Sequence, residues 1–418
     1  MTINKLHSLF LKHPTVDTDT RKIRENSIFF ALKGENFNGN FFALKALKNG
    51  AKYAIVDEDL NTNNEHIINV TDVLKTLQQL ATYHRNYLSI PIIGLTGSNG
   101  KTTTKELMHA VLHKKYNCTA TVGNLNNHIG VPLTLLSMND ETEIGIVEMG
   151  ANHLKEIELL SDIAQPNYGL ITNFGKAHLE GFGGLEGVIK GKSELYNYIK
   201  DSKGIVFVNQ HDPIQIKQAK GLNQIGIDSS IQLVNSQPFV KVSFEDLQIQ
   251  SNLIGDYNFN NIALAITIGN YFKVNKNQIK EALETYIPTN NRSQIIKKKS
   301  NKIILDAYNA NPSSMRVALE NFNTLKEQPK IVILGDMFEL GTTSNEEHQT
   351  ISELAENLNF EKIFLVGENF SSIKTRKASN FESFSEFINN IDFSTFKHST
   401  ILIKGSRGMA LERVLDFL

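Results

Sequence analysis

The chain has 418 residues, of which 40% are hydrophobic and 21% charged, a composition typical of a globular protein with roughly two to four domains. Its net charge of −1 gives no electrostatic basis for nucleic-acid binding, and no apolar run approaches the about 20 residues that a membrane span requires. The first residues lack the apolar core of a secretion signal, and the single cysteine cannot form an internal disulfide, so the sequence predicts a protein of the reducing cytosol.

The first predicted unit covers residues 1–89. We expect strands near residues 27–32 and 54–56, followed by a helix over residues 73–87. This helix runs toward Pro91, which ends it and begins the next unit because proline disfavours helical backbone in the residue before it.

The second predicted unit, residues 90–288, alternates strands and helices in the manner of a parallel sheet. Apolar and polar residues alternate between residues 225 and 254, which predicts antiparallel strands at the edge of that sheet. The other strands are expected over residues 92–96, 144–149, 168–172 and 205–209, and the helices over residues 101–112, 187–199, 258–271 and 276–286.

The third predicted unit, residues 289–418, follows a linker at residues 288–291. Its expected strands cover residues 302–306, 331–334, 363–366 and 401–404, again with helices between them. One helix is predicted to start at Pro312 after Asn311 as its N-cap, and another at a capping box formed by Ser344 and Glu347. The chain therefore reads as an α/β protein with three domains: a small α/β domain, a central domain with a phosphate loop on a parallel sheet, and a Rossmann-like C-terminal domain.

The most informative segment lies between the strand at residues 92–96 and the helix at residues 101–112. Its glycine-rich turn directs backbone N–H groups and the positive end of a helix to one point, where a polyphosphate can bind. Gly97 and Gly100 lack the Cβ atoms that would hold the backbone away, Lys101 would reach the β- and γ-phosphates, and Thr102 would hold Mg²⁺. Leu95 stands where the commonest form of this loop has glycine, so a chance glycine-rich turn remains the alternative.

Three further residues could contribute to the same chemistry. Glu148 ends a predicted parallel strand, so its carboxylate should face the phosphate loop and could bind Mg²⁺, although a solvated turn glutamate is the alternative. His178 follows the next strand and could serve a second metal or a substrate phosphate, or be an ordinary loop histidine. Lys192 taken alone would be a solvated helix lysine. His109 and His113 have a zinc-binding spacing, but no third ligand is apparent and we expect no metal there.

Together these segments resemble the Mur ligase family, and within it the MurF type. The resemblance spans essentially the whole chain, and its most specific part is Tyr-Asn-Ala-Asn-Pro at residues 308–312. The phosphate loop at residues 96–102 is similar to the variant of this family, which accounts for Leu95, and the first unit resembles a uridine-nucleotide binding domain. The other matching segments are residues 19–21, 29–34, 124–134, 148–151, 177–183, 334–341 and 404–407.

The resemblance implies a cytoplasmic enzyme that uses ATP and Mg²⁺ to join D-alanyl-D-alanine to UDP-N-acetylmuramoyl-tripeptide through an acyl phosphate, as a monomer, in peptidoglycan synthesis. The implied catalytic residues are Lys101, Glu148, His178 and Lys192. Thr102 and Glu148 would bind one metal ion, and His178 and Lys192, the latter carbamylated, a second. ATP would contact Gly97, Ser98, Asn99, Gly100, Lys101, Thr102, Thr103, Asn258, Asn261, Arg292 and Asp306. The other substrates would contact Arg21, Ala31, Leu32, Gly34, Asn126, Asn127, Tyr308, Asn309 and Asn311.

The chain departs from the family pattern at Tyr257, Leu305 and Asn38, near the implied adenine, ribose and uridine contacts. Three other functions remain open at this point. A sister amide ligase, such as a folylpolyglutamate synthetase, is disfavoured by residues 308–312. A phosphate-loop ATPase or kinase would not need the first domain, and a non-catalytic nucleotide-binding protein would tolerate loss of Glu148 and His178. The diamino acid that ends the tripeptide is left open.

Overall fold

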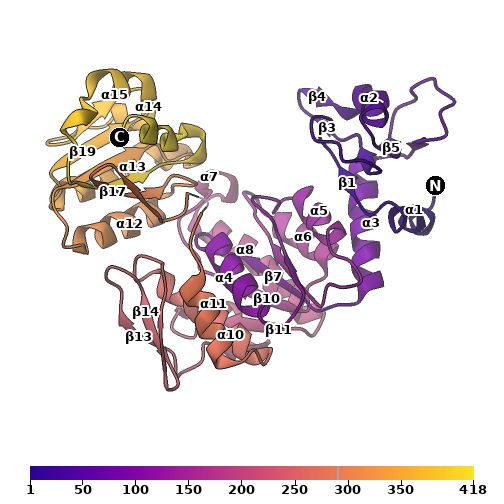
Figure 1. Ribbon diagram of the computed structural model, residues 1–418, viewed down its shortest axis with the longest axis horizontal. Helices are drawn as coiled ribbons and strands as arrows, with labels where there is room; N and C mark the ends of the chain where they lie inside the picture. Colours follow the sequence, from indigo (N-terminus) through magenta and orange to yellow (C-terminus); the bar gives the residue numbers. More distant parts are fainter. Residues whose placement is uncertain (290) are drawn as a thin grey trace.

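The computed structural model describes residues 1–289 and 291–418, which form three α/β units in chain order (Figure 1). The first unit has a parallel sheet in the order β1-β2-β5-β6. Its strands are β1 (Val16–Asp17), β2 (Ile28–Phe30), β5 (Tyr53–Val56) and β6 (Ile67–Asn69), with a hairpin of β3 (Lys33–Gly34) and β4 (Phe37–Asn38). Its helices are α1 (Ile3–Phe10), η1 (Gly39–Phe42), α2 (Ala43–Lys48) and α3 (Val73–Leu88).

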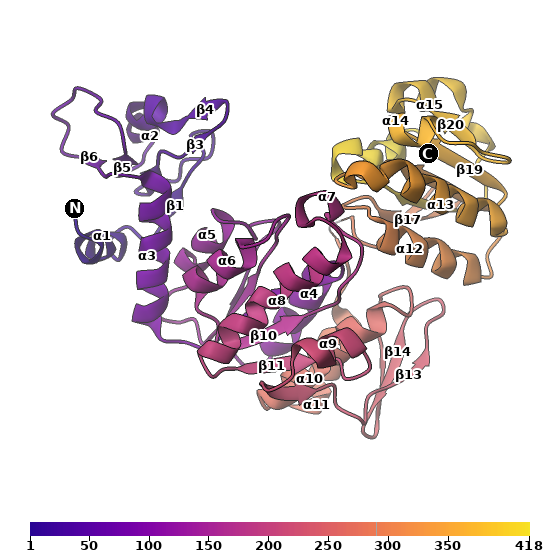
Figure 2. The ribbon, with the colours of Figure 1, turned by 180° about the vertical axis from the view of Figure 1, so that it is seen from behind.

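Helix α3 attaches the first unit to the second (Figure 2). It starts at its N-cap Asp72, whose carboxylate accepts the Lys75 N–H at 2.8 Å, and it ends at Ser89 in a left-handed conformation. Gln78, Thr82 and Arg85 on this helix donate hydrogen bonds to backbone carbonyls of the second unit. The helix therefore belongs to the first unit in sequence and packs on the second.

The second unit is a six-stranded parallel sheet in the order β12-β11-β10-β7-β9-β8. Its central strands are buried because helices cover both faces, which is the arrangement that parallel sheets require. The strands are β7 (Ile92–Thr96), β8 (Cys118–Ala120), β9 (Ile144–Glu148), β10 (Tyr168–Ile171), β11 (Ile205–Val208) and β12 (Asn223–Gly226). The helices are α4 (Lys101–Leu112), α5 (Gly130–Leu136), α6 (Glu156–Ala164), α7 (Leu179–Phe182), α8 (Leu185–Asp201), α9 (Pro213–Gln218), α10 (Asn258–Tyr271) and α11 (Lys276–Thr285).

The prediction of edge strands over residues 225–254 is wrong in two respects. Residues 225 and 226 end β12, which runs parallel to β11 and forms the sheet edge. The antiparallel strands β13 (Gln232–Asn235), β14 (Lys241–Phe244) and β15 (Leu247–Gln250) form a separate three-stranded sheet. Their alternating pattern arises because only one face of this small sheet packs on the core, through Val242, Phe244 and Ile249.

The third unit has a six-stranded sheet in the order β16-β17-β21-β18-β19-β20, in which only β16 is paired antiparallel among the described strands. The strands are β16 (Gln294–Lys298), β17 (Asn301–Asp306), β18 (Lys330–Gly335), β19 (Lys362–Val366), β20 (Ser379–Phe381) and β21 (Thr400–Lys404). The helices are α12 (Pro312–Thr324), η2 (Gly341–Thr343), α13 (Ser344–Asn357), α14 (Glu368–Ser371), α15 (Phe384–Asn390), η3 (Phe393–Thr395), η4 (Arg407–Met409) and η5 (Leu411–Asp416).

The two helix starts predicted for this unit have different outcomes. Asn311 caps α12 by accepting the Ser314 N–H at 2.9 Å, with Pro312 in the first turn, as predicted. The capping box at Ser344 is wrong because Thr343 is the N-cap of α13 and makes no side-chain cap bond. The Ser344 hydroxyl instead lies against His348 and Asn369.

The predicted α/β class with parallel sheets is confirmed, whereas the exact domain boundaries at residues 89 and 288 stay predictions. None of the helices in the described ranges combines the length and apolar character needed to span a bilayer.

Candidate active site

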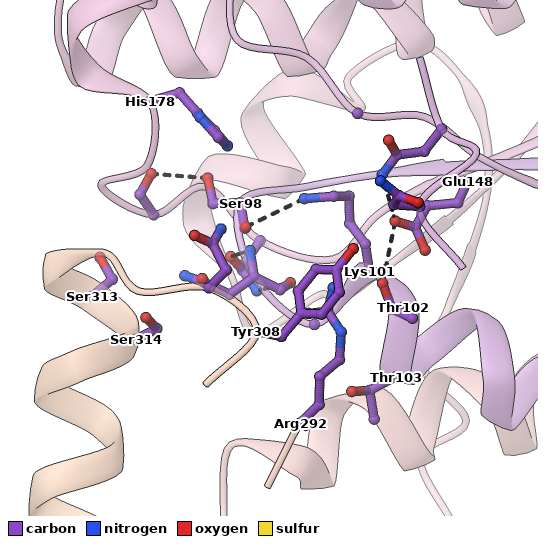
Figure 3. Close-up of a pocket in the computed structure, with 18 of the residues that line it drawn as sticks. Ser98, Lys101, Thr102, Thr103, Glu148, His178, Arg292, Tyr308, Ser313 and Ser314 are labelled. Carbon is purple, nitrogen blue, oxygen red and sulfur yellow. Dashed lines mark hydrogen bonds between the residues drawn. The ribbon is translucent and has the colours of Figure 1, made fainter. Parts of the chain in front are cut away.

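A cavity of about 850 Å³ lies where the carboxyl end of the central sheet faces the third unit (Figure 3). The central unit contributes the turn between β7 and α4 and the loops that follow β9 and β10. The third unit contributes Arg292, Asp306, Tyr308, Asn309 and Lys404. Ligands gather at this end of parallel sheets because the loops there are free to converge on one point.

The turn between β7 and α4 has the shape that the glycines predict. Gly97 has φ +144° and Gly100 has φ +80°, and α4 begins directly after Gly100. Two residues that follow β10 fix the turn from outside: Asn173 accepts from Ser98 N and Asn99 N at 3.0 and 3.1 Å, and the Thr172 hydroxyl donates to Asn99 O at 2.6 Å. The loop is therefore already ordered without a ligand, and the N–H groups in the first turn of α4 are available to bind an anion.

Gly97→Ala should destabilise the nucleotide-free protein by about 3 kcal/mol or more, since its backbone conformation favours glycine and its new Cβ would lie 2.0 Å from Thr172 Oγ1. Gly123→Ala is the matched control, because that glycine has φ +58° but nothing within 4 Å of the added atom. We expect it to cost only about 1 kcal/mol. Urea unfolding of both variants measures the difference, and equal midpoints would contradict this account of the loop.

Lys101 directs its ammonium group into the turn, where Nζ donates to Gly97 O at 2.7 Å and Ser98 O at 3.4 Å (Figure 3). Burial lowers the pKa of Lys101 to about 8, the Glu148 carboxylate opposes this, and the Arg292 cation adds to it. Lys101 is therefore mainly protonated at pH 7, and it holds its charge close to carbonyl oxygens that a phosphate could replace.

The affinity of the free protein for ATP should fall as the pH rises above about 8. The reason is that Lys101, whose pKa burial lowers to about 8, becomes neutral over that range and no longer attracts the phosphates. A bound polyphosphate favours the protonated amine, so the dissociation constant should rise about tenfold per pH unit above 8. Lys101→Arg should bind less well but without this pH dependence, because guanidinium stays charged. Calorimetric titration with ATP between pH 7 and 9.5 measures both.

Glu148 ends β9 and is 1% exposed, which excludes the solvated-turn alternative. Its Oε1 accepts from Asn126 Nδ2 at 2.8 Å and from the Thr102 hydroxyl at 3.3 Å (Figure 3). Its Oε2 is buried without a hydrogen-bond partner in the described part of the chain. A buried carboxylate oxygen without a partner is costly, and it is the kind of ligand that Mg²⁺ prefers.

The residues around Glu148 fit a magnesium ion that is shared with a nucleotide. Within the described ranges, no cluster of three or more His, Cys, Asp and Glu side chains could hold a metal ion alone. Magnesium is commonly bound by one or two carboxylates, and the substrate phosphates complete its coordination. The Thr102 hydroxyl and the free oxygen of Glu148 meet that requirement beside the phosphate loop.

His178 and Lys192 occupy different positions at this site. His178 lines the cavity, and its Nδ1 contacts the Glu339 carboxylate of the third unit, whose pKa this contact lowers. Lys192 does not line the cavity; it is 1% exposed on α8, and its Nζ donates to Ala151 O at 3.1 Å. Burial, together with the Lys101 cation, holds the pKa of Lys192 well below its usual value.

The third unit places a cationic and aromatic cluster opposite the phosphate loop. The guanidinium of Arg292 lies 3.8 Å from the centre of the Tyr308 ring, and that of Arg407 lies 4.9 Å from it. The Nε of Arg292 is buried and has no hydrogen-bond partner among the described residues, so it is available to an anion. Asn311 donates to Asn99 Oδ1 in the phosphate loop at 2.8 Å, which joins the two units directly.

Asn258 and Asn261 lie on the first turns of α10, beside the start of α4. Asn261 donates to Asn258 Oδ1 at 2.8 Å and accepts from the Thr104 hydroxyl at 3.1 Å. A Cβ on Gly100 would approach Asn261 Oδ1 to 2.8 Å, so glycine permits this close packing. Tyr257 lies next to them, and its hydroxyl is hydrogen-bonded to Ser293 at 2.8 Å.

The predicted substrate residues of the first unit lie apart from the cavity (Figure 1). Arg21 is exposed and paired with Asp19 at 2.7 Å, Ala31 and Leu32 are buried, and Gly34 ends β3. Of the other predicted residues, Ser98, Asn99, Gly100, Thr103, Asn126, Asn127, Asp306 and Asn309 line the cavity, whereas Gly97 and Asn311 do not. The structure thus gathers most of the residues predicted to contact ATP at the cavity and leaves the residues predicted to contact the uridine nucleotide away from it.

Several residues of the site have no role in the sequence analysis. Thr172 and Asn173 shape the phosphate loop, and the Thr121 hydroxyl accepts Glu148 N at 2.9 Å. Lys404 ends β21 and donates to Asp306 Oδ2 at 2.6 Å, and β21 lies beside β17 in the sheet. Their position in the sequence could have indicated them, because each of these residues comes at or just after the carboxyl end of a parallel strand.

Comparison with known proteins gives consistent matches along the chain. Residues 95–269 match the Mur ligase middle domain, and residues 291–407 match the family model described as Mur ligase, glutamate ligase domain. The UDP-N-acetylmuramoyl-tripeptide–D-alanyl-D-alanine ligase of Bacillus subtilis is 34% identical over 96% of this chain and 92% of its own length.

Solved structures agree with these matches. A crystal structure of MurF from Acinetobacter baumannii has a TM-score of 0.85 at 32% identity and covers 96% of this chain and 92% of its own. MurF from Thermotoga maritima in complex with ADP has a TM-score of 0.84 at 27% identity, with 97% of each chain covered. The site and the comparisons lead to the same result: this chain belongs to the Mur ligase family, in the branch that carries the MurF name.

Proposed function

We propose that this protein is an ATP-dependent ligase that joins D-alanyl-D-alanine to UDP-N-acetylmuramoyl-tripeptide, releasing ADP and phosphate, in the cytoplasmic synthesis of peptidoglycan precursors. The observation that carries the proposal is the cavity that sets the phosphate loop against Arg292, Asp306 and Tyr308. The relative from Bacillus subtilis, which bears the name of this activity, aligns with nearly the whole chain. The structure from Thermotoga maritima in complex with ADP supports a nucleotide as one ligand.

The reaction first requires activation of a carboxylate, which is a poor electrophile. The γ-phosphoryl group of ATP is transferred to the terminal carboxylate of the tripeptide, and an acyl phosphate forms. Lys101 and Arg292, which both line the cavity, would stabilise the negative charge of the transferring group, assisted by the first N–H groups of α4 (Figure 3). Thr102 and Glu148 would hold one Mg²⁺, and His178 with a carbamylated Lys192 would hold a second, and these ions would neutralise further phosphate charge.

The second step forms the amide bond. The free amine of D-alanyl-D-alanine attacks the acyl carbon, and phosphate leaves from the tetrahedral intermediate. Tyr308 and Asn309 line the cavity on the side of the third unit, and Asn311 contacts Asn99 of the phosphate loop beside them, so we assign the dipeptide to that side. Contact of the third unit with the phosphate loop would keep water from the acyl phosphate.

The remaining assignments extend the same proposal. The three domains are residues 1–89 for the uridine end of the substrate, residues 90–288 for ATP, and residues 289–418 for the dipeptide. Asn258 and Asn261 would contact the adenine and Asp306 the ribose, whereas Arg21, Ala31, Leu32 and Gly34 would contact the uridine nucleotide. We propose that the protein acts as a monomer.

The direct test incubates the protein with ATP, Mg²⁺, UDP-N-acetylmuramoyl-tripeptide and D-alanyl-D-alanine and measures product masses. We expect the pentapeptide product together with one ADP per amide bond. A panel of tripeptides ending in lysine or meso-diaminopimelate identifies the acceptor. ATP hydrolysis that is unaffected by either peptide substrate would indicate a simple ATPase and contradict the proposal.

A further inference from the structure

Glu339, in the turn between β18 and η2 of the third unit, contacts the loop after β10, which carries the proposed metal ligand His178, and the loop after β9, which follows the proposed ligand Glu148. Its carboxylate is paired with Nδ1 of His178 in the loop after β10. The other carboxylate oxygen accepts from Asn152 Nδ2, in the loop after β9, at 3.5 Å. Its backbone carbonyl accepts Glu180 N at 3.3 Å. One residue of the third unit thus connects the two metal-side loops of the central unit.

Both partners of the central contact have unusual backbone conformations. His178 has φ +53° and Glu339 has φ +60°, in the left-handed region that residues with a Cβ rarely adopt. Such conformations cost free energy and persist where the surrounding structure fixes them, most often at functional sites. A salt bridge that served only to join two surfaces would not need this geometry at both ends.

The contact determines which nitrogen of His178 is free. A carboxylate at Nδ1 can only accept a hydrogen bond, so Nδ1 carries a proton and Nε2 is the nitrogen that can offer a lone pair to a cation. Figure 3 shows the His178 ring directed into the cavity toward Ser98. We propose that Glu339 is a positioning residue that fixes the tautomer and orientation of His178, so that Nε2 faces the phosphates and cation of the active site.

This inference rests on the proposed function only for the role of His178. It also makes the position of His178 in the central unit depend on a residue of the third unit. Because Glu339 belongs to the third unit, His178 is held correctly only when the third unit is seated on the central unit. Assembly of the metal site would therefore depend on the third unit, which lines the side of the cavity to which we assign the dipeptide. The tautomer itself depends on the contact and not on any substrate.

A nearby ion pair provides a matched control. Lys176 Nζ lies 2.6 Å from Glu347 Oε1, so this pair joins the same two units two residues from His178 without touching the imidazole. If Glu339 served only to hold the units together, Glu339→Ala and Glu347→Ala should have similar effects. If it positions His178, their effects should differ. The Glu339 side chain is 48% exposed, so its removal should leave the fold intact.

The experiment records ¹⁵N signals of the histidine rings in the full, nucleotide-free chain, with His178 assigned from His178→Gln. We expect the Nδ1–H tautomer of His178 in the wild type and in Glu347→Ala, mixed tautomers in Glu339→Ala, and recovery in Glu339→Gln, whose amide oxygen can still accept. Mn²⁺ affinity in the presence of ADP, together with kcat, should fall about 10–100-fold in Glu339→Ala and less than about threefold in Glu347→Ala.

An unchanged His178 tautomer in Glu339→Ala, or equal losses in the two alanine variants, would overturn the inference. The ring signals require no substrate, so they report on positioning even if the wild-type protein forms no amide product. In that case the proposed function would fail, and a tautomer that still depends on Glu339 would support the positioning role alone.

Discussion

Lys101→Ala should lower kcat for ligation by about 10²–10³-fold while the protein stays folded. Lys101 is the first residue of α4, and its ammonium group lies within hydrogen-bonding distance of the carbonyls of the phosphate loop. Charge that builds on a transferring phosphoryl group is stabilised most by a cation already in place, because no reorganisation is then needed. The measurement is the steady-state rate of ADP release coupled to product formation.

A conservative substitution and a control variant test this expectation further. Lys101→Arg keeps the charge but not the compact geometry of an ammonium group, so we expect partial activity. Lys114 lies just beyond the other end of α4, where its side chain is paired with Glu281 at 2.7 Å, so Lys114→Ala should leave the rate unchanged. Full activity of Lys101→Ala would contradict the assignment of the phosphate site.

Glu148→Gln should reduce ligation by at least about 10²-fold and weaken the dependence of the rate on Mg²⁺. The substitution is isosteric, so the hydrogen bond from Asn126 can persist, but the negative charge that would hold the cation is lost. Because Glu148 Oε2 is buried without a partner among the described residues, the substitution breaks no hydrogen bond to that oxygen. The same variant should therefore unfold at an equal or higher temperature without nucleotide.

The two effects of opposite sign distinguish a functional carboxylate from a structural one. A structural role predicts that stability and activity fall together, whereas a cation-binding role predicts lost activity at preserved or increased stability. Glu141→Gln, at an exposed position before β9, is the control and should change neither quantity. Rate measurements over a range of Mg²⁺ concentrations and thermal unfolding give both values.

The sequence predicts the framework of the site well because that framework is local. The strand at residues 92–96, the turn and the helix at residues 101–112 follow one another directly, so hydrophobic pattern and glycine positions determine them. The N-cap at Asn311 is local in the same way. Strands β8 and β20 are only three residues long, too short for a periodic pattern to predict, and only their neighbours in the sheet define them.

What the sequence could not predict are contacts between distant segments. His178 and Glu339 are 161 positions apart, and Asn99 and Asn311 are 212 positions apart. These pairs form only when two units are placed against each other, which no local pattern specifies. The burial of Lys192 could not be predicted for a similar reason. Its helix taken alone would leave the side chain in solvent, and the side chain becomes buried only when α8 packs on the central sheet.

The most direct test of the central claim follows an oxygen atom through the reaction. The tripeptide substrate is prepared with ¹⁸O in its terminal carboxylate and incubated with the protein, ATP, Mg²⁺ and D-alanyl-D-alanine, and the released phosphate is weighed by mass spectrometry. Activation of the carboxylate by phosphoryl transfer predicts one ¹⁸O in each phosphate released. Phosphate without label, at normal product formation, would contradict the account.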